Sequence, residues 1–199
     1  IVAIILANAA IGDSPEDEAK MPLIRWGTVA LGVTLLPLGI IAAISTGLRI
    51  NQYGLTPDRL WAVVFGGIAC AYGLAYLVAL IRRRGGWMAD IRPANVQLAI
   101  GLCALAFVLA MPIINFGAWS TASQLARLES GAVLPDKFDW RAMRFDFGPS
   151  GQVAVERLAK ISKTPAIKLA ATDALKLDNR WDDLQQTDNR SLDRQIKVI

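Results

Sequence analysis

The sequence Arg82-Arg83-Arg84-Gly85-Gly86-Trp87 separates the two apolar stretches that decide the fold. Residues 60–81 before it and residues 93–119 after it carry no charged side chain. An α-helix rises about 1.5 Å per residue, so about twenty such residues cross the hydrocarbon core of a bilayer, which is about 30 Å thick. The two stretches are therefore predicted to be membrane-spanning helices joined by a basic turn.

The remaining first part of the chain is also largely apolar. Residues 23–48 form a third predicted transmembrane helix, and residues 1–10 are interpreted as the end of a truncated one. Residues 11–22 form an acidic loop between them. More than half of the charged side chains lie in residues 120–199, which predicts a small helical tail in water. The predicted fold class is an all-α, polytopic membrane protein with an extracytoplasmic helical tail.

The basic residues predict the orientation, because cytoplasmic loops carry an excess of Lys and Arg. Four arginines in and after the turn are interpreted as topology anchors: Arg82, Arg83, Arg84 and Arg92. Segment 11–25 adds Lys20 and Arg25. We therefore expect segments 11–25 and 82–92 on the cytoplasmic side of the membrane. Segment 49–59 and the tail are then expected on the far side, which in a bacterium is the periplasm.

Small residues recur at helical spacing on the two helices beside the turn. They are Gly67, Ala71, Ala75 and Ala79 on the first helix and Ala99, Cys103, Ala106 and Ala110 on the second. Small side chains allow two helix backbones to approach closely in lipid. We expect these two stripes to face each other, although small residues are also simply common in membrane helices.

The tail is predicted to consist of short helices. One runs from Ser120 to Ser130, a second is capped by Ser150, and a third begins at Thr164-Pro165. In the second helix, Ala154, Leu158 and Ile161 are expected to point inward. A short amphipathic turn precedes it at residues 139–145.

Side chains suited to catalysis are sparse in this sequence. The chain contains no histidine, which removes the commonest metal ligand and the commonest general base. Asp136, Asp139 and Asp146 surround an aromatic cluster, but interleaved arginines favour packing and ion pairing over a glycosidase pair. Residues 60–81 and 93–119 hold no charged side chain for coupled transport. We expect no enzyme, no cofactor, no metal, no nucleic-acid partner and no identifiable small-molecule substrate.

Three sequence strings resemble a known family. They are Arg49-Ile50-x-x-Tyr53-Gly54-Leu55-Thr56-Pro57-x-Arg59, Ala126-Arg127-Leu128-Glu129-Ser130-Gly131 and Met143-Arg144-Phe145-x-x-Gly148-x-x-Gly151. Their order and spacing relative to the spans resemble the bacterial multi-spanning family labelled domain of unknown function 4153, over residues 23–163. The resemblance implies an inner-membrane protein with further N-terminal helices. It brings no activity, ligand or catalytic residue.

The sequence favours a non-enzymatic accessory or scaffold subunit of a larger membrane assembly. The expected partners are the lipid bilayer and other membrane protein subunits, with Tyr53, Trp140, Arg144 and Phe145 as candidate partner contacts. The alternative is a transporter or channel component whose polar pathway lies in helices that this chain lacks. A membrane-anchored periplasmic enzyme would need a nucleophile or metal site that residues 120–199 do not offer.

Overall fold

The computed structural model describes residues 2–12, 14, 16–17, 20–82 and 86–181, and these residues form helices and no strand. The helices fall into two compact units, which are described separately. The membrane unit comprises residues up to Tyr53 and Asp58–Ile114, and the tail unit comprises Gly54–Pro57 and the chain from Asn115 onward. The all-α fold class predicted from the sequence is confirmed.

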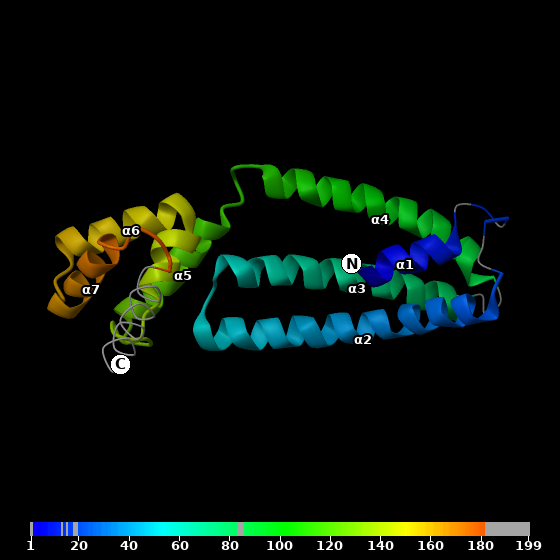
Figure 1. Ribbon diagram of the computed structural model, residues 1–199, viewed down its shortest axis with the longest axis horizontal. Helices are drawn as coiled ribbons and strands as arrows, with labels where there is room; N and C mark the ends of the chain where they lie inside the picture. Colours follow the sequence, from blue (N-terminus) through cyan, green and yellow to red (C-terminus); the bar gives the residue numbers. More distant parts are fainter. Residues whose placement is uncertain (1, 13, 15, 18–19, 83–85, 182–199) are drawn as a thin grey trace, which may run out of the picture. The chain divides into compact units, whose positions relative to one another are not determined.

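The membrane unit contains α1 (Val2–Ile11), α2 (Pro22–Tyr53), α3 (Pro57–Arg82) and α4 (Trp87–Ala110). The last three are long and apolar enough to cross a membrane. They run up and down in succession, and α1 packs against α2 (Figure 1). Their outward-facing apolar side chains are exposed, as expected for helices surrounded by lipid rather than water.

Glycines bring α2 and α3 close together. A Cβ added at Gly73 of α3 would lie 2.7 Å from the Leu36 backbone, and one added at Gly39 of α2 would lie 3.0 Å from Cys70 Sγ. Dispersion contacts at such close backbone approach drive helix association in lipid. The buried core beside this contact includes Tyr76, Trp87 and Ile91.

The last span differs from its prediction at both ends. It was expected over residues 93–119, but α4 begins at Trp87 and ends at Ala110. Met111 is extended, with φ −71° and ψ 143°, because the ring of Pro112 disfavours helical geometry in the preceding residue. Pro112 therefore ends the helix, and Phe116 opens a new one.

The tail unit contains α5 (Phe116–Glu129), the π-helical turn η1 (Ala142–Asp146), α6 (Gly148–Ile161) and α7 (Pro165–Leu175). The predicted start of α7 after Thr164 is confirmed. The predicted cap at Ser150 is wrong, because α6 already begins at Gly148 with Pro149 in its first turn, where a missing N–H costs nothing. Ile161 is also not inward, being 64% exposed.

Candidate functional site

A hollow of about 530 Å³ lies in the membrane unit, between the starts of α2 and α4 and the end of α3. Its lining combines three kinds of side chain. Lys20 and Arg25 are cationic, Trp26 and Trp87 are aromatic, and the aliphatic part is formed mainly by Val29, Val33 and Leu80. Among the described lining residues there is no carboxylate.

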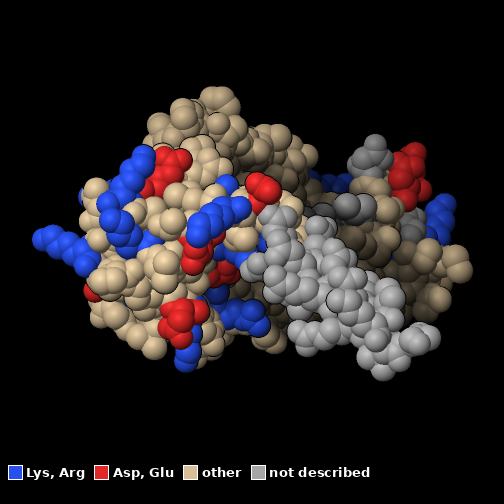
Figure 2. All heavy atoms as spheres, turned by 60° about the vertical axis from the view of Figure 1, so that its left-hand side comes forward, with Lys and Arg blue, Asp and Glu red and all other residues tan. Residues whose placement is uncertain are grey.

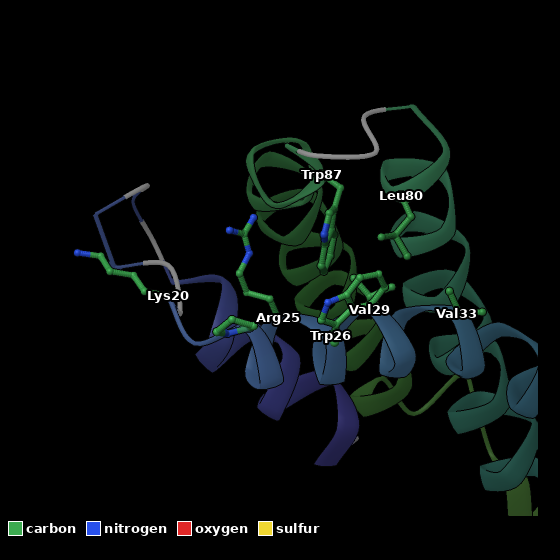
Figure 3. A pocket seen from close by; sticks show the side chains of 8 residues that line it. Lys20, Arg25, Trp26, Val29, Val33, Leu80 and Trp87 are labelled. Atoms are coloured by element: carbon green, nitrogen blue, oxygen red, sulfur yellow. The ribbon is translucent and has the colours of Figure 1, made fainter.

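Helix geometry explains how this lining is arranged. Arg25, Val29 and Val33 are spaced four residues apart on α2, which places them on one face of the helix. Trp87 opens α4 and is held rigidly, since it is buried and its ring centroid lies 6.4 Å from that of Tyr76. In Figure 3 the Arg25 side chain rises from α2 beside Trp87, and Lys20 lies at the outer edge of the hollow with its side chain extending away from the other lining residues.

A polar cluster lies beside this hollow, where α1, α3 and α4 meet. The Tyr76 hydroxyl donates to Asn8 Oδ1 at 2.9 Å, and Asn95 Nδ2 donates to the same oxygen at 2.6 Å. Asn95 Oδ1 is buried and has no hydrogen-bond partner among the described residues. The cluster fastens α1 to the other helices. It contains no carboxylate or imidazole, and no group of potential metal ligands occurs in the described part of the chain.

Arg92 has a structural role that its assignment as a topology anchor did not include. Its guanidinium donates to the carbonyl oxygens of Ile11, Gly12 and Ser14 at 3.2, 3.3 and 2.8 Å. These carbonyls lie at and just after the C-terminal end of α1, where a cation is favoured by the helix dipole. Arg82 is exposed at the end of α3. Arg83 and Arg84 lie outside the described residues.

The two predicted stripes of small residues do not form the tightest helix contact. Gly67 and Ala71 are exposed, Ala75 is half-buried and Ala79 is buried, while Ala99, Cys103, Ala106 and Ala110 are all exposed. Gly67 and Ala71 border one hollow between α3 and α4, and Ala106 and Ala110 border another. The facing of the stripes stays a prediction. The close approaches at Gly32, Gly39 and Gly73 were not predicted, although the seven-residue spacing of Gly32 and Gly39 was a usable signal.

The four candidate partner contacts lie in different environments. Tyr53 is 58% exposed at the end of α2. Trp140 is buried in the tail core, where its Nε1 donates to the Pro135 carbonyl at 2.8 Å, so it packs rather than faces a partner. Arg144 donates to the Ala174 carbonyl, and its guanidinium lies 5.0 Å from the ring centre of Phe145. Asp146 pairs with Arg180.

The Gly54–Pro57 loop docks on α5 within the tail unit. The Leu55 N–H donates to Ser123 Oγ at 3.0 Å, and Gln124 Nε2 donates back to the Leu55 carbonyl at 2.9 Å. Gly54 has φ +76°, a conformation that glycine adopts without strain, and an added Cβ would lie 2.6 Å from Arg127 Cδ. These contacts explain the structural role of Gly54 and Leu55 in the Tyr-Gly-Leu-Thr-Pro string.

The tail unit carries a groove of about 730 Å³ between α5, α6 and the start of α7. Leu128, Ala154 and Leu158 line it together with three exposed apolar side chains: Leu134, Val153 and Ile161 are 55%, 63% and 64% exposed. Glu129, Arg157 and Lys163 are its charged lining residues. Charges of both signs are interspersed over the tail unit in Figure 2, with uncharged areas between them.

Comparison with known proteins identifies the family. A family model described as Domain of unknown function (DUF4153) matches residues 1–158, which is most of the chain. No curated protein and no solved structure matches. The match includes the hollow, the polar cluster, the loop docked on α5 and most of the tail groove. The chain therefore belongs to the DUF4153 family.

Proposed function

We propose that this chain is a non-enzymatic, multi-pass protein of the bacterial inner membrane. It serves as an accessory or scaffold subunit of a larger membrane assembly, with its tail unit in the periplasm. Three helices hold the chain in the bilayer. The tail unit then offers the docking surface to another subunit.

The tail groove is the observation that carries this proposal. Large apolar side chains exposed to water together are uncommon in a monomeric domain and mark interaction surfaces. Val153 and Ile161 lie on one side of α6, eight residues apart, and both line the groove. An amphipathic helix of a partner subunit fits a groove of this kind, with its apolar face against Val153, Leu158 and Ile161.

The test uses the full chain in native membranes. A photo-crosslinking amino acid at position 153 should give one discrete adduct with a partner in fixed stoichiometry. Val153→Glu combined with Ile161→Glu should lower recovery of that partner at least about tenfold, because each buried apolar side chain contributes roughly 1.5–3 kcal/mol.

Leu169 supplies the matched control. It is 65% exposed on α7 and is not among the residues that line the groove. Leu169→Glu adds one glutamate to the same unit, the same change as either groove substitution alone, and should leave partner recovery unchanged. Equal recovery with all variants, or the lack of any partner in fixed stoichiometry, would reject the groove as the docking surface.

A second candidate function, a transporter or channel component, is favoured by one observation. The buried Asn95 Oδ1 lacks a partner among the described residues, and it lies beside Tyr76 and Asn8 within the membrane unit. A charged group on a helix of another subunit would complete a polar path there. Ion conductance of the purified assembly in planar bilayers, lost on Asn95→Leu, would favour this alternative over a purely structural role.

A further inference from the structure

The lining of the hollow changes from cationic to aliphatic along α2. Arg25 lies in the second turn of α2. Val29 and Val33 follow on the same face, and a rise of about 1.5 Å per residue puts Val33 about 12 Å further along the helix. A single face therefore presents a cation at one end and aliphatic surface beyond it.

Two tryptophans mark the depth of this hollow in the bilayer. Trp26 is 70% exposed one residue after Arg25, and Trp87 forms a buried wall at the start of α4. Tryptophan favours the level of the lipid headgroups, where its ring is in apolar surroundings and its N–H can reach water. The cations of the hollow are thus at headgroup level, and its aliphatic wall is at acyl-chain level.

The charge of the hollow selects its occupant. Its described lining has two cations and no carboxylate. Arg25 lines the hollow beside Trp87, and Lys20 stands at its edge with its side chain extending outward (Figure 3). A guanidinium binds phosphate oxygens through two parallel hydrogen bonds. A zwitterionic lipid would bring its own cation beside Arg25, whereas an anionic lipid brings only the phosphate and uncharged groups.

We propose that this hollow is a binding site for one anionic phospholipid. Arg25 holds the phosphate, Lys20 adds attraction at the rim, and one acyl chain lies along Val29, Val33 and Leu80. Trp87 closes the wall beside the phosphate. The site is independent of the tail groove and of any partner subunit.

The test measures lipids retained by the full chain in native mass spectrometry from mild detergent. Phosphatidylglycerol and phosphatidylcholine with the same acyl chains are the probes. We expect one phosphatidylglycerol to remain bound at concentrations that leave no phosphatidylcholine. Arg25→Gln should weaken its binding about fivefold, the usual contribution of one basic residue to anionic lipid binding, and Arg25→Lys should restore most of it.

Two further variants separate this site from general attraction to the basic end of the molecule. Arg82→Gln removes one cation from the same end but from outside the lining, and should leave lipid retention unchanged. Val33→Trp fills the aliphatic part while keeping both cations, and should abolish retention in a protein whose helix content is intact. Ile40→Trp, at an exposed α2 position outside the lining, is its control.

Equal retention of both lipids, or equal loss with Arg25→Gln and Arg82→Gln, would overturn the proposal in favour of ordinary annular lipid. Full retention by Val33→Trp would also overturn it, because the acyl chain would then lie elsewhere.

Discussion

Arg92 shows how one residue can serve both topology and packing. Replacing it with glutamine removes the cation from three carbonyl oxygens at the end of α1. We expect Arg92→Gln to lower the stability of the membrane unit by about 1–2 kcal/mol, the usual contribution of charge-assisted hydrogen bonds at a helix end. The melting temperature in detergent should fall by several degrees.

Arg82→Gln is the control for this prediction, because it also removes one arginine from the basic end but is exposed at the end of α3. Its melting temperature should match that of the unaltered protein. An equal decrease in both variants would mean that the net charge of this end, and not the contacts of Arg92, determines stability. The basic character of Arg92 was evident from the sequence, but its partners depend on the fold of α1 against α4.

At the scale of helices, composition predicted which long helices form, whereas a proline determines where the last of them ends. Long apolar stretches identified all three long helices, and the Thr164-Pro165 pair marked the start of α7. Pro37 stays within α2, since a backbone in lipid has no water to satisfy groups released by unwinding. Pro112 instead ends α4. The apolar run continues past it to residue 119, so hydropathy alone could not locate that end.

The contact between α2 and α3 leads to a prediction on helix packing. Gly73→Ala places a Cβ 2.7 Å from backbone atoms of Leu36, which cannot move aside as a side-chain end could. We expect the two helices to separate slightly, at a cost of about 1–3 kcal/mol, measured as a lower melting temperature in detergent.

Gly67→Ala is the matched control on the same helix, because nothing lies within 4 Å of a Cβ at that position. It should be neutral or stabilise by up to about 1 kcal/mol, since alanine favours the helix more than glycine does. The same variant tests the predicted stripe. A loss of stability with Gly67→Ala that equals the loss with Gly73→Ala would place the principal helix contact along Gly67 and Ala71 instead.

Within the membrane unit, the three long helices alternate in direction, so the starts of α2 and α4 lie at the same end as the end of α3 (Figure 1). The hydrogen bonds from Arg92 hold this part of α4 beside Ile11 at the end of α1 and Ser14 just after it. The charge count predicts that this end is cytoplasmic. Because successive membrane helices alternate in direction, the sequence could predict which helix ends lie on the same side. It could not predict the contacts within the tail unit. Those contacts join residues 55 and 123, which no local pattern connects.

Orientation is tested by single cysteines in a background with Cys70→Ala and Cys103→Ala. Lys20→Cys and Gly86→Cys should react with a membrane-impermeant maleimide only after the cells are opened, since both lie at the basic end of the membrane unit. Thr56→Cys and Lys137→Cys should react in intact spheroplasts, because one connects α2 to α3 and the other follows α4. The reverse pattern would put the tail groove in the cytoplasm and restrict its partner to that compartment. Labelling of Lys20→Cys and Thr56→Cys from the same side would contradict α2 as a membrane-spanning helix.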